Sequence, residues 1–171
     1  QSQIYLVPSG GGEARLLTDL KGDFGPFEWS PDGRQLVVQF RRKDAEEIER
    51  EKDERKKGLG IVARHITRVV YKADGSGFLP TERWHVVIVG ARSGRATHLT
   101  DGDLYDETEP RWSPDGRHIL FMSNRSEDPD FNPDVVDLYV VPVEGGELRK
   151  IPTHVGLKGM PSPSPDGRWV A

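Results

Sequence analysis

The chain has 171 residues, of which 35% are hydrophobic and 30% are charged, a composition typical of a soluble globular domain. Its net charge of -4 comes from 28 acidic and 24 basic residues scattered in both signs, and no apolar run approaches the roughly 18 residues of a membrane span, so neither a nucleic-acid-binding face nor a membrane segment is expected. The absence of cysteine excludes disulfides, thiolate nucleophiles and cysteine-based zinc sites, and is compatible with a cytoplasmic protein.

The first element in the chain is a predicted hairpin over residues 4–19, with the sequence IYLVPSGGGEARLLTD. An apolar strand is followed by a glycine-containing turn and a shorter strand. The same arrangement returns at residues 85–101 and 137–151. Hairpin turns account for the glycine groups at 10–12 and 145–146, because neither group leads into a helix carrying Lys-Ser or Lys-Thr, as a phosphate-binding loop would.

A second kind of hairpin is centred on Ser-Pro-Asp-Gly-Arg, which begins at Ser30, Ser113 and Ser164. Ser, Pro and Asp suit the first three positions of a type I turn, and Gly accepts the left-handed conformation that follows. Apolar β-formers flank the first two copies, which predicts a three-residue hairpin loop with a bulge. We expect the three turns to superpose, with Trp29 and Trp112 in equivalent buried positions. The packing must differ in the third copy, where Pro163 replaces the tryptophan.

Between the first two copies lies the run RRKDAEEIEREKDERKK, residues 41–57, in which 15 of 17 residues are charged. Acidic residues cluster early in this run, basic residues cluster late, and Gly58 follows it. Opposite charges recur four residues apart, which favours a helix. These pairs are Glu46/Arg50, Glu51/Arg55 and Asp53/Lys57. The run therefore predicts a solvent-facing helix inserted into a repeat unit.

In chain order, the two kinds of hairpin give a repeating unit of four antiparallel strands, which is one blade of a β-propeller. Ser113 and Ser164 are 51 residues apart, compatible with one blade of about 40 to 50 residues, whereas Ser30 and Ser113 are 83 residues apart. An alternative reads YKADG at residues 71–75 as a degenerate further copy of the turn. We prefer one interrupted blade, because the charged run offers no third and fourth strands for a blade that would end before Tyr71.

The expected fold is all-β: a partial β-propeller of about three four-stranded antiparallel blades with one charged helical insertion. Residues 1–19 would end one blade, and residues 20–101 would form the next, with the insertion at about 41–80. A further blade would span 102–153, and 154–171 would begin another. The chain opens without methionine or a signal segment and stops in mid-pattern, so we expect a piece of a longer protein. Its open ends are expected to self-associate or to be disordered.

Two longer stretches carry a family likeness: RHITRVVYKADGSGF at residues 64–78 and LTDGDLYDETEPRWSPDGRHILFMSNRSEDPD at residues 99–130. With the repeated turns, they resemble the N-terminal propeller of bacterial acylaminoacyl-peptidases and dipeptidyl-aminopeptidases of the prolyl oligopeptidase family. The resemblance covers essentially the whole chain, and the interrupted blade is its most specific part, since the SPDG repeat alone also occurs in TolB-type propellers. It implies a seven- or eight-bladed propeller over an α/β-hydrolase domain, restricting access to short peptides.

No catalytic, cofactor-binding or metal-binding residue is expected in this chain. It contains no Gly-x-Ser-x-Gly nucleophile elbow, so the catalytic residues that the resemblance implies would lie in the hydrolase domain. None of the five histidines pairs with another at a metal-binding spacing. The segment DPDFN at 128–132 begins like a calcium loop, but Pro133 and Tyr139 replace the required glycine and glutamate, so an ordinary loop is predicted.

The charged insertion is the candidate for a binding role. The resemblance implies that acidic side chains on a propeller insertion can hold the free N-terminal ammonium of a peptide, and Glu46, Glu47 and Glu49 are acidic residues on such an insertion. A carboxylate facing a cavity pairs with an ammonium group in a low dielectric. The alternative interpretation, which the charge run by itself favours, is a solvated helix face.

The leading hypothesis is the non-catalytic propeller portion of a serine exopeptidase, which gates and helps to bind short peptides for a separate C-terminal α/β-hydrolase domain. Its partners would be its own missing blades, that hydrolase domain and short peptides, with neither nucleic acid nor membrane. The alternative is a TolB-like binding or interaction propeller with no attached hydrolase. A parent reading frame that continues into further blades and a Gly-x-Ser-x-Gly elbow would favour the first hypothesis.

Overall fold

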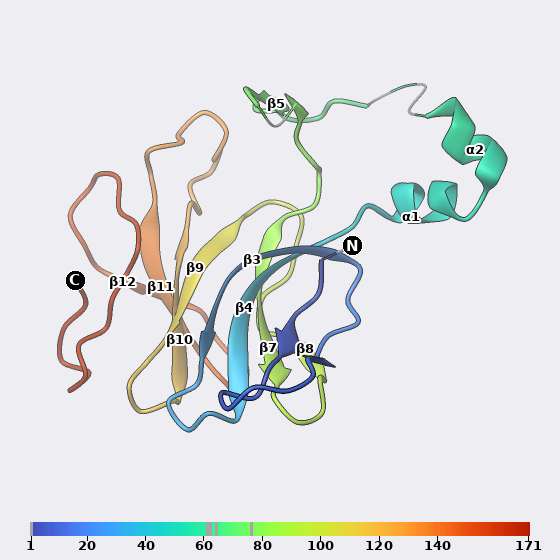
Figure 1. Cartoon of the computed structure of the whole chain (residues 1–171). Coiled ribbons are helices and arrows are strands. Elements are labelled where there is room, and N and C mark those ends of the chain that lie inside the picture. The colour runs from blue at the N-terminus through green and yellow to red at the C-terminus, as the bar shows by residue number, and fades with distance from the viewer. Residues whose placement is uncertain (1, 61–62, 64, 76) are drawn as a thin grey trace.

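The computed structural model describes residues 2–60, 63, 65–75 and 77–171. Its strands form two four-stranded antiparallel sheets, with the orders β3-β4-β7-β8 and β12-β11-β10-β9, and two small two-stranded sheets, β1-β2 and β5-β6 (Figure 1). The elements are β1 (Tyr5–Leu6), β2 (Arg15–Leu16), β3 (Gly22–Trp29), β4 (Gln35–Arg42), α1 (Ala45–Glu51), α2 (Glu54–Leu59), β5 (Lys72–Ala73), β6 (Gly77–Phe78), β7 (Trp84–Gly90), β8 (Ala96–His98), β9 (Glu107–Trp112), β10 (His118–Ser123), β11 (Asp137–Pro142) and β12 (Arg149–Ile151).

Each four-stranded sheet is one propeller blade; we call β3-β4-β7-β8 blade 1 and β9–β12 blade 2. The predicted all-β partial propeller with a charged helical insertion is confirmed. Blade 1 is interrupted between β4 and β7, which pair directly with each other. The YKADG segment lies within the interruption, where β5 and β6 pair only with one another, as the interrupted-blade interpretation expects.

The central strands of blade 1 are apolar on both faces because a blade is stacked between two neighbours. Val37, Val38, Val86 and Val87 are all fully buried. Val38 packs on one face with Ile4 and Leu17 from the β1-β2 region. Val37 packs on the other face with Trp112 and Phe121 of blade 2. The β-branched runs in β4 and β7 thus form a fully buried sheet layer.

The three SPDG turns have the same hydrogen bonds, as predicted. In each copy the serine hydroxyl donates to the aspartate carboxylate, at 2.7, 2.5 and 2.6 Å, and the glycine N–H donates to the serine carbonyl. The glycines have φ of 68°, 68° and 69°, in the left-handed region that favours glycine. The serine hydroxyl, and next the arginine backbone N–H, lower the pKa of Asp32, Asp115 and Asp166 below the ordinary value.

The expectation that Trp29 and Trp112 are equally buried is wrong. Both end the first strand of a blade, but Trp112 is 5% exposed and Trp29 is 47% exposed. The Trp112 side chain packs between the blades, and its indole N–H donates to the Glu28 carbonyl. The described residues include no inner strands of a preceding blade, so no equivalent surface covers Trp29.

The charged run forms two short helices instead of the single helix that was predicted. Helix α1 ends where Asp53 adopts an extended conformation and caps α2, accepting hydrogen bonds from the backbone N–H groups of Arg55 and Lys56. None of the residues of either helix is buried, as expected for a solvent-facing insertion. The predicted pairs four residues apart are replaced by Lys43/Glu47, Lys43/Glu51, Lys52/Glu49 and Lys57/Glu54. None of the described helices is long and apolar enough to span a bilayer.

A buried polar network joins the two blades at the end opposite the SPDG turns. The carboxylate of Glu107, which is 1% exposed, contacts His85 Nδ1 at 2.7 Å and accepts a hydrogen bond from the Thr100 hydroxyl at 2.9 Å. It also pairs with the Arg125 guanidinium, which lies over the ring of Tyr105. Since an unpaired buried carboxylate is costly, these partners must all be in place for the blades to dock.

We expect Phe121→Ala to lower the free energy of unfolding by about 3 to 5 kcal/mol, because the buried ring fills the interface between the blades and its loss leaves a cavity. The matched control is Phe131→Ala, which removes a ring that is 68% exposed and should change the value by less than about 0.5 kcal/mol. Urea denaturation measures both. Equal losses in the two variants would contradict the stacking of blade 2 on blade 1.

Candidate binding groove on the loop face

Every long connection of the two blades lies at one end of the strands. The SPDG turns and the glycine turns lie at the opposite end, which we call the turn face. The end that carries residues 43–83, 99–106 and 124–136 we call the loop face; it includes the helical insertion at the top of Figure 1. The tight turns leave little room for a ligand, so the loop face is where a binding site can form.

Two adjoining hollows form a groove on the loop face. The larger, of about 960 Å³, is lined by α1, by residues 65–71 and by residues 78–82. The smaller, of about 480 Å³, lies beside Arg83, Leu104 and Asp128. The two hollows share four residues, Thr67, Arg68, Thr81 and Glu82. Each hollow by itself has the size of a site for a small ligand.

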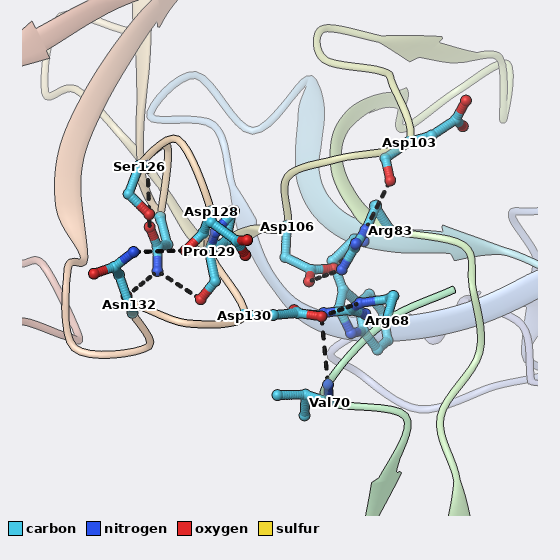
Figure 2. A network of polar contacts seen from close by, with 12 residues as sticks. Arg68, Val70, Arg83, Asp103, Asp106, Ser126, Asp128, Pro129, Asp130 and Asn132 are labelled. Atoms are coloured by element: carbon cyan, nitrogen blue, oxygen red, sulfur yellow. Dashed lines mark hydrogen bonds and ion pairs between the residues drawn. The ribbon is translucent and has the colours of Figure 1, made fainter. Parts of the chain in front are cut away.

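Ion pairs hold the returning arm of the insertion against blade 2 (Figure 2). The Arg68 guanidinium binds both carboxylate oxygens of Asp130, at 2.7 and 3.3 Å, and the same carboxylate accepts from the Val70 backbone N–H. This pairing lowers the pKa of Asp130. Arg83, which is buried, donates to the Asp103 carbonyl at 3.0 Å and to the Asp106 carboxylate at 3.3 Å. These bidentate and paired contacts fix the floor of the smaller hollow.

Six carboxylates and four Lys or Arg side chains line the larger hollow. Lys43 lies 2.6 Å from the carboxylate of Glu51 and 3.4 Å from that of Glu47, and the pairing raises the pKa of Lys43. Three of the carboxylates, on Asp44, Glu46 and Glu82, form no ion pair with any described residue. Arg42 and Arg50, which also line the hollow, likewise form no ion pair with a described residue. Because six carboxylates outnumber four cationic side chains, the hollow has a net negative charge.

Glu82 lies close to the Asp44 carboxylate. Partial burial, and next the adjacent Asp44 carboxylate, raise the pKa of Glu82 above its ordinary value of 4.5. Asp44 is held in place because its carboxylate caps α1, accepting a hydrogen bond from the Glu47 N–H at 2.8 Å. Two carboxylates close together favour either a shared proton or a bound cation.

Apolar side chains also line the larger hollow. Ile66, Val70, Tyr71 and Phe78 line it and are all exposed, and the rings of Tyr71 and Phe78 lie 6.1 Å apart between their centroids. A hollow lined by both apolar side chains and carboxylates suits a ligand with a cationic end and apolar side chains, such as a short peptide with a free N-terminus.

The predicted ammonium-binding acids are only partly brought together. Glu46 and Glu47 line the larger hollow, Glu46 without an ion-pair partner among the described residues and Glu47 beside Lys43. Glu49 does not line the hollow; it pairs with Lys52, which is the main cause of its lowered pKa. Sequence reasoning missed Glu82, because no local pattern shows that it lies beside Asp44, 38 positions earlier in the chain.

The segment DPDFN is a loop between β10 and β11, as predicted, and its Asp130 binds Arg68. Asn132 donates its side-chain amide to the Asp128 carbonyl, which closes the loop on itself (Figure 2). Within the described ranges, no three His, Cys, Asp or Glu side chains gather as the ligands of a metal ion would. The properties of the groove that can select a ligand are therefore its charge and its shape.

The chain is similar in sequence to proteins with two kinds of name, a peptidase and a Tol-Pal system protein. It is 34% identical over 130 residues, 75% of this chain and 19% of the relative, to the uncharacterized peptidase YuxL of Bacillus subtilis. It is 28% identical over 130 residues, 66% of this chain and 28% of the relative, to the Tol-Pal system protein TolB of Francisella tularensis. The chain thus spans less than a third of the length of either relative. No protein-family model matches it.

A solved structure supports the same fold. The acylaminoacyl peptidase of Pyrococcus horikoshii superposes with a TM-score of 0.61 at 17% sequence identity, over 88% of this chain and 21% of the peptidase chain. At this identity the superposition shows the fold alone. It places the blades described above in the propeller class.

Glu82→Gln should make the chain more stable at pH 7 than the unchanged protein. Because the folded-state pKa of Glu82 is raised, the folded chain holds that proton more tightly than the unfolded chain, and stability falls as pH rises from the ordinary value of 4.5 through the raised pKa. The neutral amide of Gln does not ionise, so this loss of stability with rising pH disappears. Urea denaturation between pH 4 and pH 7 measures it for both proteins.

The control for the cause of the shift is Asp44→Asn, which should lower the pKa of Glu82 by removing the neighbouring charge. A carbon-detected NMR titration of the Glu82 carboxyl reports this pKa directly. Titration of Glu82 at or below 4.5 in the unchanged chain would show that the two carboxylates do not lie together at the groove.

Proposed function

We propose that the chain is part of a β-propeller that binds short peptides and admits them to the α/β-hydrolase domain of a serine exopeptidase. The observation that carries the proposal is the 34% identity over 130 residues to a protein named as a peptidase. That relative is much longer than this chain, which spans 19% of its length. The remaining length is ample for further blades and a hydrolase domain.

The groove on the loop face supports a role in peptide binding. Its unpaired carboxylates, Asp44, Glu46 and Glu82, offer charge for the N-terminal ammonium of a peptide, and Ile66 and Phe78 offer contact for apolar side chains. We retain Glu46 and Glu47 as proposed ligands of the ammonium group. Glu49 would take part only if its pair with Lys52 opened. Partial burial strengthens such charge-assisted hydrogen bonds relative to those in bulk water.

In this proposal the chain selects substrate and leaves the chemical step to another domain. Acyl transfer requires a nucleophile activated by a positioned base and an oxyanion hole of preorganised donors. The sequence spells no strand-turn-helix with Gly-x-Ser-x-Gly that would expose such a serine. A propeller that filters or orients a peptide raises specificity without contributing to the reacting atoms.

The second candidate function is a TolB-like interaction propeller with no hydrolase attached. The similarity to TolB of Francisella tularensis, at 28% identity over 130 residues, favours it. In that case the loop face would bind a protein segment, and the same carboxylates would select a basic one. The two functions therefore differ in the chemistry of the complete protein rather than in the shape of the groove.

The complete protein encoded by the reading frame of this chain should react covalently with a fluorophosphonate probe at one serine within a Gly-x-Ser-x-Gly sequence. That reaction should be lost when this serine is changed to alanine, because only an activated serine is phosphonylated. Peptide mapping by mass spectrometry locates the label. A complete protein that lacks the elbow and remains unlabelled would replace this function with the TolB-like one.

The 171-residue chain alone should neither react with the probe nor hydrolyse acyl-amino-acid or dipeptide anilides above background. The reason is that filtering acts on access and supplies no nucleophile. Turnover that disappears when one serine of this chain is changed would show that the nucleophile lies here, contrary to the proposed division of labour.

A further inference from the structure

The β3-β4 hairpin of blade 1 supplies hydrogen-bond acceptors to the first strand of blade 2. The Glu28 carboxylate accepts from the Trp112 backbone N–H at 2.9 Å, and the Glu28 carbonyl accepts from the Trp112 indole N–H at 3.3 Å. The Gln39 side chain accepts from the Glu109 N–H at 2.9 Å. The tryptophan that ends one blade's first strand is thus clamped by a carboxylate on the hairpin before it.

Trp29 occupies in blade 1 the position that Trp112 occupies in blade 2. It pairs with Leu36 as Trp112 pairs with Ile119, and each tryptophan precedes a serine whose N–H closes the hairpin. In both strands, therefore, the backbone N–H of the tryptophan points away from the partner strand, at the open edge of the blade. In blade 2 the Glu28 side chain of blade 1 reaches this N–H. The side chain of Trp29 is 47% exposed and that of Phe27 is 51% exposed, whereas Pro110, which corresponds to Phe27, is fully buried.

The rest of this face of blade 1 is already an interface. Ile4 and Leu17, beside β1 and β2, are buried against Leu36, Val38 and Phe40. Strands β1 and β2 correspond to the two outer strands of a blade, since a glycine turn joins them as it joins β7 to β8 and β11 to β12. Phe27 and Trp29 on β3 are exposed and extend this interface. They lie where the two inner strands of the preceding blade would pack.

We propose that Phe27 and Trp29 are the seat of a further Ser-Pro-Asp-Gly hairpin, the inner hairpin of the blade to which β1 and β2 belong. The residue two positions before the serine of that hairpin presents its carboxylate to the backbone N–H of Trp29 and its backbone carbonyl to the indole N–H, as Glu28 does to Trp112. The occupant is therefore another segment of the same protein, which belongs to the blade of β1 and β2 and carries an acidic residue two positions before its serine. This inference is independent of whether the complete propeller belongs to a peptidase or to a TolB-like protein.

The pairing rule within the chain supports the required carboxylate. Glu28 stands two residues before Ser30, and the next hairpin offers it Trp112. In blade 2 the corresponding residue is Arg111, and the next hairpin has Pro163, which carries no N–H to donate. A hairpin thus carries the carboxylate when the next hairpin has a tryptophan before its serine, and lacks it when the next hairpin has a proline there. Trp29 accordingly calls for an acidic residue on the hairpin that covers it.

A second copy of the chain fits the seat less well. The C-terminal hairpin, whose bridge joins Pro163 to Val170, is the one SPDG hairpin at a chain end. At the position of the required carboxylate it has Ser162, which cannot supply a charged acceptor. Self-association through this hairpin would therefore lack the clamp seen at Trp112.

The test is a fusion of the full chain with an added N-terminal copy of residues 22–42, joined to Gln1 by a flexible Gly/Ser linker. The tether supplies a high effective concentration, which an isolated hairpin needs because it is marginally stable in water. Within the added copy, Trp29→Phe keeps the new segment free of indole signals. Nitrogen-15 NMR then follows the backbone N–H and the indole N–H of Trp29 in the full chain, both assigned with a Trp29→Phe variant of that chain.

We expect the added hairpin to slow hydrogen exchange of the Trp29 backbone N–H by about tenfold or more and to shift its resonance, because a charge-assisted hydrogen bond forms in a covered site. The matched control carries Glu28→Ala in the added copy and should lose most of this protection. An unchanged indole resonance of Trp112 in both fusions verifies that the blades are folded.

Three results would overturn the proposal. The first is an unprotected Trp29 in both fusions while Trp112 keeps its resonance. The second is equal protection with and without the carboxylate. The third is protection of Trp29 in the unfused chain that rises with protein concentration, measured together with light scattering, which would make a second copy the occupant.

Discussion

Strands β4 and β7 carry apolar side chains on both faces, and this constraint governs the rest of the molecule. Such a sheet buries its surface only between two other layers, so a blade of this protein depends on its neighbours. Apolar contact alone would leave the angle between blades loosely defined. The hydrogen bonds from Trp112 to Glu28 and the buried pairing of Glu107 with Arg125 add direction, and they lie toward opposite ends of the interface.

This stacking explains why one end of the blades is free to vary. The SPDG turns close by local hydrogen bonds and leave short, uniform loops at the turn face. The other end has no such restriction, and β4 and β7 remain paired although 41 residues separate them. Blade 1 therefore tolerates a long insertion, and the ion pair of Arg68 with Asp130 returns that insertion to blade 2. The groove exists because these connections meet at one face.

Local sequence was sufficient for features whose determinants are close together in the chain. The SPDG turns follow from Ser30, Asp32 and Gly33, whose contacts are all within five residues, and the interrupted blade follows from the lack of strand patterning in the charged run. Local sequence misled where a neighbour decides the outcome. Trp29 has the flanking sequence of a buried residue, but it is 47% exposed because no hairpin among the described residues lies over it.

The candidate site was predictable only in part for the same reason. Helical charge patterning located Glu46 and Glu47 on an insertion, but the break at Asp53 depends on that aspartate preferring to cap a new helix. The proximity of Asp44 to Glu82 arises from the path of the insertion, which no spacing rule describes. The sequence therefore indicates acidic character on the loop face, and the structure selects which acids face the groove.

We propose above all that the loop face, and not the turn face, binds a peptide by its cationic end. The direct measurement is a nitrogen-15 NMR titration of the chain with an apolar tripeptide that has a free N-terminus, compared with its N-acetylated form. The account predicts shifts at Thr67, Thr81 and Glu82 that require a several-fold lower concentration of the free-amine peptide than of the acetylated one. Shifts confined to the turns at Gly33 and Gly116, or equal binding of both peptides, would contradict it.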